Sequence, residues 1–187
     1  MKNKKELYED ALAIARGNVP PSKIHLDISL EKGKMLAEEY KANIDLVLIG
    51  IVLMDIKLSE AMKLNIGPEH PKMASDFAKE FLKDYDLTDN EKNIIINSIE
   101  AHHGKVPFKS IEAEICANAD CYRFIHPIGV FAYLGMLAKR DLPFIEQIES
   151  LKFKLEEKHN ILSLPKAKEE LEEYYIEYSK QFDEILK

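Results

Sequence analysis

The strongest constraint in the sequence is a run of nine consecutive residues without a polar side chain, residues 46–54. A helix over residues 46–56 would be apolar nearly all round, so it would have no face suited to water. We therefore expect this segment at the centre of the folded core. The run is far shorter than the roughly 18 residues that a membrane-spanning helix needs, and no membrane span is expected.

Helix start and stop signals recur along the chain, whereas strand signals are nearly absent. Ser22 is a candidate N-cap, and Asn43 or Asp45 opens the apolar helix. Thr88 and Glu91 have the spacing of a capping box. These signals predict helices over residues 3–16, 23–40, 46–56, 70–82, 89–102, 109–124, 127–139, 142–159 and 165–186. The predicted fold class is all-α, one domain of about eight or nine helices over residues 1–187.

The composition fits a single globular domain and restricts its partners. Acidic residues (33) outnumber lysine and arginine (26), and the net charge of -7 argues against general electrostatic binding to nucleic acid or to an anionic membrane. A phosphate ligand would need a local reversal of this field. Cys116 and Cys121 are expected to be reduced apolar residues. No apolar segment of an export signal follows the charged N-terminus, so a cytoplasmic location is expected.

Ionisable side chains on apolar stripes are the anomalies that point to chemistry, because burying them is costly without compensation. The candidates are Asp55, Asp120, His102 and His103, together with His25 and His70 at helix beginnings. Asp55 directly follows the apolar run, at a helix C-terminus where the dipole also disfavours a carboxylate, so a cation would resolve both problems. Imidazole and carboxylate together suit a divalent transition metal. The set predicts a metal site.

Each of these residues also has an ordinary structural explanation. A single inward histidine is more often a core residue than a ligand. Asp55 could cap the next turn or pair with Lys57, and Asp120 could pair with Arg123 on its own helix. The metal hypothesis therefore depends on the combination of residues and on their order.

The ordered set of His25, Asp55 and Asp120 resembles the HD-domain superfamily of metal-dependent phosphohydrolases. Asp55 stands where the family has its His-Asp pair, 30 residues after His25 (55 − 25) and directly after the apolar helix. His102 and His103 look like the extra histidines of the family branch that can hold a second metal ion.

One residue departs from the family pattern. The signature histidine falls on Met54, and a neutral thioether is a weak ligand for Mn, Fe or Mg. The resemblance covers about residues 20–140 and implies a helical bundle of the HD type, with a C-terminal helical extension over residues 142–187.

The resemblance also implies a divalent metal cofactor, either Fe, Mn, Ni, Zn or Mg, with one or two ions per chain. The implied ligands are His25, Asp55 and Asp120 for a first ion, and His70, His102 and His103 for a second ion or the phosphate. The implied substrate is small and phosphorylated, either a phosphate ester or a nucleotide.

The implied reaction is the attack of a metal-activated water on phosphorus. Asp55 would orient the water, and Lys57 would act beside it as a second catalytic residue. Lys105 and Arg123 would bind the substrate by neutralising the phosphate. Loss of the dyad histidine gives an alternative, in which catalysis is weakened and the protein binds metal or nucleotide, or serves as an interaction module.

The last predicted helix, residues 165–186, lies outside the resemblance. It carries a wide apolar stripe with acidic residues on the opposite face. Such a stripe either packs on the parent domain or forms a homodimer contact.

Overall fold

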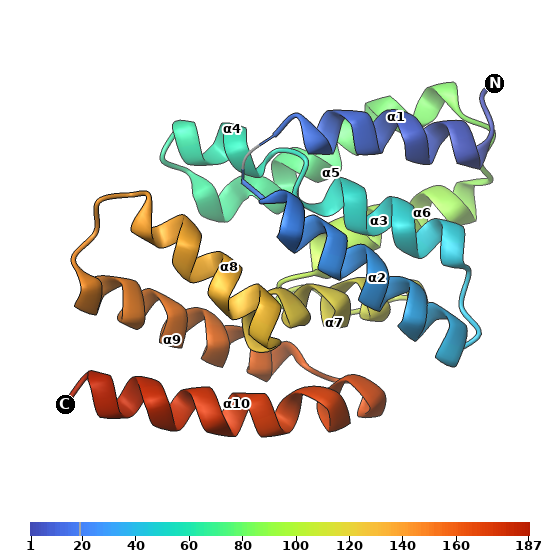
Figure 1. Cartoon of the computed structure of the whole chain (residues 1–187). Coiled ribbons are helices and arrows are strands. Elements are labelled where there is room, and N and C mark those ends of the chain that lie inside the picture. Colours follow the sequence, from blue (N-terminus) through green and yellow to red (C-terminus); the bar gives the residue numbers. More distant parts are fainter. Residues whose placement is uncertain (19) are drawn as a thin grey trace.

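The computed structural model describes residues 1–18 and 20–187, which form ten α-helices and no β-strand. The helices are α1 (Lys4–Arg16), α2 (Lys23–Glu39), α3 (Ile44–Met54), α4 (Leu58–Lys63), α5 (His70–Phe81), α6 (Asp89–Ala101), α7 (Ile111–Ile125), α8 (Pro127–Ala138), α9 (Phe144–Ile161) and α10 (Pro165–Ile185) (Figure 1). Short 3-10 turns, η1 (Gly67–Glu69) and η2 (Leu82–Asp84), flank α5. The all-α prediction is confirmed. All nine predicted helical segments are present, and the additional helix, α4, has six residues.

The predicted caps explain where several helices begin. The Ser22 side chain accepts a hydrogen bond from the backbone N–H of His25 at the start of α2. The Asn43 side chain caps α3 in the same way. The capping box of Thr88 and Glu91 forms at the start of α6, with both reciprocal hydrogen bonds present.

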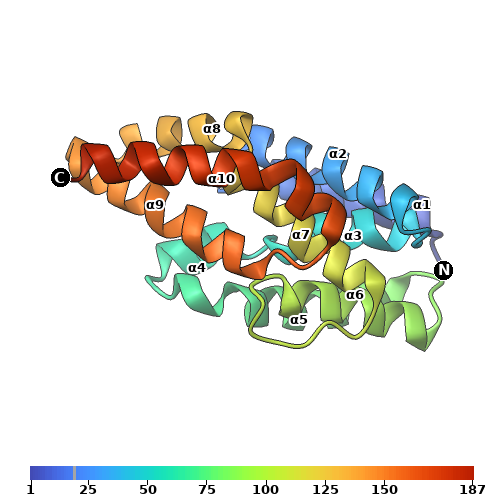
Figure 2. The same ribbon diagram turned by 90° about the horizontal axis from the view of Figure 1, so that it is seen from below.

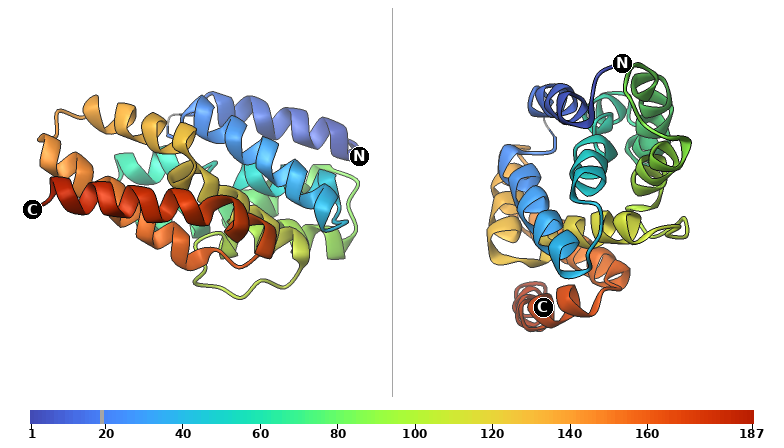
Figure 3. Two further views of the ribbon diagram at one scale, coloured as in Figure 1. Left: turned by 60° about the horizontal axis from the view of Figure 1, so that its bottom comes forward. Right: turned by 90° about the vertical axis from the view of Figure 1, so that its right-hand side faces the viewer.

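The apolar helix α3 lies at the centre of the bundle, as the sequence predicts. It packs against α1, α2, α5, α6 and α7, which surround it when the molecule is seen end-on (Figure 3). Every residue from 46 to 54 except Leu48 is buried. α2 approaches closely because it carries Gly33 at the crossing, where a Cβ atom would lie 2.2 Å from Ile51 Cδ1.

The C-terminal helices α8, α9 and α10 form one side of the molecule, and the two chain ends lie at opposite ends of it (Figures 1 and 2). α10 packs on α9 and α7 and buries Leu171, Tyr178 and Phe182. Glu170 of α10 accepts a hydrogen bond from the Tyr122 hydroxyl at 2.9 Å. The apolar stripe of the last helix therefore faces the rest of the chain.

The most apolar helix, α3, is largely covered by its neighbours. No single helix within residues 1–18 and 20–187 is long and apolar enough to cross a membrane. α7 and α8 reach that length and composition only as a pair, and they are bent by 65° relative to each other. Most residues of α7 are buried inside the bundle.

Candidate functional site

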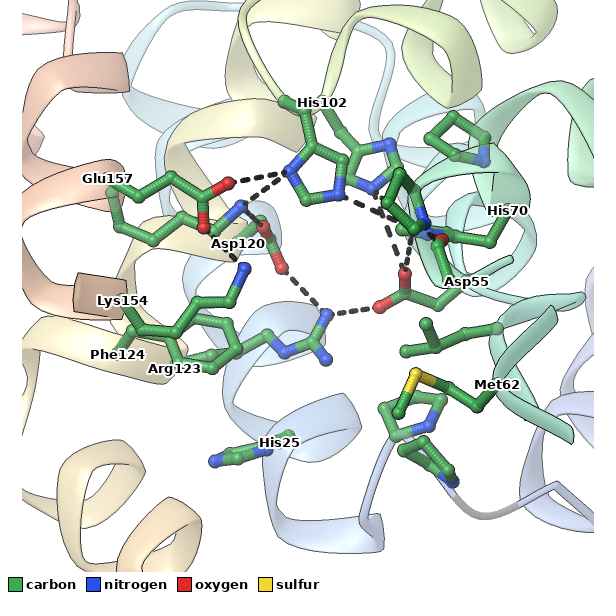
Figure 4. A pocket seen from close by; sticks show the side chains of 18 of the residues that line it. His25, Asp55, Met62, His70, His102, Asp120, Arg123, Phe124, Lys154 and Glu157 are labelled. Atoms are coloured by element: carbon green, nitrogen blue, oxygen red, sulfur yellow. Dashed lines mark hydrogen bonds and ion pairs between the residues drawn. The ribbon is translucent and has the colours of Figure 1, made fainter. Parts of the chain in front are cut away.

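A cavity of about 710 Å³ opens where the C-terminal ends of α3 and α6 meet the start of α5. α7, α8 and α9 complete its walls (Figure 4). Eight of the nine residues predicted from the sequence to act in the site line this cavity: His25, Asp55, His70, His102, His103, Lys105, Asp120 and Arg123. The ninth, Lys57, is not among the lining residues.

Three histidines meet on one side of the cavity. His70 is the first residue of α5, and His102 and His103 directly follow α6. The Nε2 atom of His70 lies 3.2 Å from Nε2 of His102 and 3.4 Å from Nε2 of His103. The three rings offer ligand atoms that all lie within 4.8 Å of one another, so this cluster could hold a metal ion.

Backbone carbonyls fix the tautomers of two of these rings. Nδ1 of His70 lies 2.7 Å from the carbonyl oxygen of Gly67, and Nδ1 of His102 lies 2.7 Å from that of Ile99. A carbonyl oxygen only accepts, so both Nδ1 atoms carry a hydrogen and donate it. In the neutral rings the facing Nε2 atoms are then both acceptors. Histidines that ligate metals usually have their second ring nitrogen held in this way.

A carboxylate joins the same cluster. Oδ1 of Asp55 lies 3.1 Å from Nε2 of His70 and 3.7 Å from Nε2 of His102. Burial, reinforced by His103, lowers the pKa of His102 to about 3, so this ring is neutral near pH 7. Acceptor atoms therefore converge without enough hydrogens between them, and a cation relieves the conflict. A donor set of imidazole nitrogens with one carboxylate fits a divalent transition metal.

The Arg123 guanidinium lies between Asp55 and Asp120 (Figure 4). Its Nη1 atom is 2.5 Å from Oδ2 of Asp55 and 2.7 Å from Oδ1 of Asp120. Lys158 of α9 approaches the other oxygen of Asp120, with Nζ 2.5 Å from Oδ2. Burial alone would raise the pKa of the two carboxyl groups, but the cations beside them hold both pKa values below the ordinary range. The pairing of Asp120 with Arg123, one helical turn away, is thus present.

His25 lies apart from this carboxylate pair (Figure 4). Its Nε2 atom is 3.0 Å from the carbonyl oxygen of Gly129 in α8 and donates a hydrogen bond to it. Burial, with a further contribution from Arg123, lowers the pKa of His25 to about 4. The structure therefore does not assemble His25, Asp55 and Asp120 as a metal site, because Arg123 takes the space between the carboxylates and His25 is held by α8.

No protein-family model matches the sequence. A solved structure, described as a predicted HD superfamily hydrolase from an uncultured Thermotogales bacterium, matches with a TM-score of 0.64 at 14% sequence identity. The chain has the HD-domain fold. The match covers 95% of this chain and 90% of the other, so it must include most of residues 142–187. The HD fold therefore extends well beyond the segment that carries the sequence resemblance.

Two further residues show how this chain uses the HD fold. Met54, which the sequence resemblance aligns with the dyad histidine, is buried in the apolar core and is not among the residues that line the cavity. Lys57 pairs with Glu60 at 2.7 Å and lies 5.1 Å from the ring centroid of Phe77. Lys57 directly precedes α4, and its catalytic role stays a prediction.

The contribution of α9 to the site was not predicted from the sequence. Lys154, Glu157 and Lys158 line the cavity, and Lys158 is only 1% exposed. Nζ of Lys158 also lies 3.3 Å from Nδ1 of His103. One signal was available: Lys158 continues the helical spacing of Leu151 and Leu155, so a lysine falls on a buried stripe.

The walls of the cavity in this HD fold reverse the charge of the molecule. Six lysine or arginine residues line it against four aspartate or glutamate residues, although the chain as a whole carries -7. The basic residues are Lys72, Lys105, Arg123, Arg140, Lys154 and Lys158, and the acidic ones are Asp55, Glu100, Asp120 and Glu157. This is the local reversal of the field that a phosphate ligand requires.

Proposed function

We propose that the protein is a metal-dependent phosphohydrolase acting on a small phosphate ester. One observation carries the proposal: three acceptor atoms, from His70, His102 and Asp55, converge beside the His103 ring inside a cavity with a net basic lining. A metal ion satisfies the acceptors, and the basic lining suits an anionic substrate.

The proposed ligands of the ion are the Nε2 atoms of His70, His102 and His103 and one oxygen of Asp55. When bound, such an ion stabilises charge on a phosphoryl oxygen and supplies an activated water near neutral pH. Asp55 is oriented for ligation because Arg123 binds its Oδ2 atom, which leaves Oδ1 facing the histidines. The nitrogen-rich set favours Fe, Mn, Ni or Zn over Mg.

The cavity suggests the chemical class of the substrate. Its volume of about 710 Å³ lies within the range of small-molecule sites. Lys105, Arg140 and Lys154 can neutralise a phosphate group, and aromatic side chains such as Phe124 and Tyr133 offer an apolar wall for the organic part of the ester. A mononucleotide has both of these parts.

A second candidate function follows from the position of Met54 in the core. Without the dyad histidine, the same centre could bind a metal ion and a phosphorylated ligand, such as a nucleotide, without turnover. Both candidates require the metal ion, and only the first requires phosphate release.

The experiment compares wild-type protein with His102→Gln and with a matched control, His159→Gln. His159 is outside the cavity lining and pairs with Glu172 at 2.9 Å. After purification we expect a near-stoichiometric transition metal in wild type and in the control, and its loss in His102→Gln. Phosphate release from a panel of phosphate esters and nucleotides should follow the metal content. A protein that neither contains nor takes up metal contradicts the proposal, whereas metal binding without turnover favours the second candidate.

A further inference from the structure

The position of Arg123 has a consequence for how many metal ions the centre can hold. Asp55 and Asp120 are buried carboxylates, 6% and 2% exposed, of the kind that usually needs a cation between them. That cation is the Arg123 side chain, itself 4% exposed. A single nitrogen, Nη1, makes both contacts, at 2.5 Å and 2.7 Å.

This contact differs from the usual arginine–carboxylate pair. A guanidinium commonly binds one carboxylate with two parallel hydrogen bonds. Here one nitrogen sits between oxygens from two different helices, as a bridging ion would, and the buried Nε atom has no hydrogen-bond partner within the described residues. The position of the guanidinium is therefore set by contacts to both carboxylates, and not by two parallel hydrogen bonds to one of them.

We propose that Arg123 takes the place of a second metal ion between Asp55 and Asp120, so that the centre holds one ion, at the three histidines. This inference rests on the proposed function, because it presumes an ion at His70, His102 and His103. It makes Arg123 a positioning residue that fixes Asp55 and excludes a neighbouring ion.

The charges around the two carboxylates support the inference. Asp55 and Asp120 carry two negative charges, and Arg123 and Lys158 carry two positive charges within 2.7 Å of them. This group is electrically balanced without any metal ion between the carboxylates. An additional divalent ion at that point would have to displace Arg123, because like charges at such distances repel strongly in a buried site. Lys158 lies on the other oxygen of Asp120, so Arg123 is the cation that takes this position.

The side chains of Met54 and His25, the other potential ligands at this point, do not face the two carboxylates. Met54 is buried in the apolar core, and His25 donates its Nε2 hydrogen to the carbonyl oxygen of Gly129. In the histidine cluster, in contrast, carbonyl oxygens hold the Nδ1 atoms of His70 and His102, and the Nε2 atoms of these two rings face each other. One of the two predicted ion positions is therefore intact, and an arginine fills the other.

The test counts Mn²⁺ ions bound by metal-free protein, using calorimetry and electron paramagnetic resonance. It compares wild type, Arg123→Met, Arg123→Lys and a surface control, Arg16→Met. We expect about one ion in wild type, in Arg123→Lys and in the control, with the spectrum of an isolated ion. Arg123→Met should bind about two ions close enough to couple magnetically, as in two-metal sites with a separation of about 4 Å.

The outcomes separate this inference from the proposed function. Two coupled ions in wild type, or a single ion in folded Arg123→Met, would overturn the role of Arg123 and leave the metal centre standing. Wild type that binds no Mn²⁺ overturns the metal centre itself and the inference with it. If Arg123→Met does not fold, the wild-type spectrum still decides, since a coupled pair contradicts the inference and an isolated ion supports it.

Discussion

At the scale of single residues, Asp120 connects the two buried cations of the site. Its two oxygens face Arg123 at 2.7 Å and Lys158 at 2.5 Å. Removing one member of such a network leaves buried charge without compensation, which costs more than the intact pair contributes. Substitution of Asp120 is therefore expected to reduce the stability of the cavity wall.

We predict that Asp120→Asn destabilises the metal-free protein by about 3 kcal/mol, because both cations lose a carboxylate partner. Urea unfolding measures the change, and Asp76→Asn is the matched control, since Asp76 is exposed and lies 3.5 Å from Lys79. Adding Lys158→Met to Asp120→Asn should recover part of the loss. Equal stability of Asp120→Asn and the control would contradict the buried charge network.

His25 makes the stability of the protein dependent on pH. Burial, followed by the effect of Arg123, lowers its pKa from 6.5 to about 4 in the folded chain. The unfolded chain therefore binds the proton more tightly, and acid favours unfolding. The stabilising contribution is complete above about pH 6.5 and is lost as the pH falls toward 4.

From this shift we predict that His25 alone lowers the free energy of unfolding by about 2 kcal/mol between pH 7 and pH 5. The measurement is urea unfolding of wild type and His25→Gln at both pH values, with a chelator present. His25→Gln should show a smaller change than wild type. The same pH dependence in both proteins would exclude His25 as a source of acid sensitivity.

At the scale of helices, the contact between α7 and α8 positions both His25 and Arg123. Gly129, the third residue of α8, lies against the backbone of α7, where a Cβ atom would be 2.4 Å from the carbonyl oxygen of Arg123. Backbone cannot rotate away as a side chain can. The carbonyl of the same glycine accepts the hydrogen bond of His25.

We therefore predict that Gly129→Ala destabilises the protein by about 3 kcal/mol through overpacking against a helix backbone. Gly135→Ala is the control on the same helix, because a Cβ atom there meets nothing within 4 Å. That control should be neutral or should stabilise by up to about 1 kcal/mol through helix propensity. Thermal unfolding compares the two, and similar values for both variants would mean that α7 and α8 are not in close contact at Gly129.

The helices themselves could be predicted because their signals are local. Ser22, Asn43 and Thr88 are caps whose hydrogen bonds form within one turn. α4 was not predicted, because six residues are too few to show the helical period of apolar residues. The buried position of Lys158 was not predicted, because lysine side chains usually reach solvent. Its buried partner, Asp120, lies on another helix and is brought next to it only by the fold.

At the scale of the whole molecule, the candidate site depends on contacts between helices that are far apart in the sequence. The sequence placed Asp55 and Asp120 on inward faces, and both are buried. The sequence did not decide whether a metal ion or Arg123 would neutralise Asp120. An inward-facing aspartate with an arginine three residues later is compatible with either partner. Only the packing of α3 against α7 brings Asp55 within reach of that arginine. The ring of His25 lines the cavity and faces the carbonyl oxygen of Gly129, a contact between α2 and α8 that no local pattern in the sequence shows.

The net charge of the chain also has a different meaning once the fold is known. The excess of acidic residues that gives -7 lies largely outside the cavity, whose lining has more basic than acidic residues. An acidic protein can thus present a positive interior to a phosphorylated substrate. A bound divalent ion would add to this field.

We propose one metal ion at the histidine cluster, with Arg123 between the carboxylates. Anomalous diffraction from a crystal grown with Mn²⁺ would locate the ion. We expect one peak within bonding distance of the Nε2 atoms of His70, His102 and His103, with Arg123 still in contact with Asp55. A peak between the carboxylates with Arg123 displaced, or no peak at the histidines, would contradict the account.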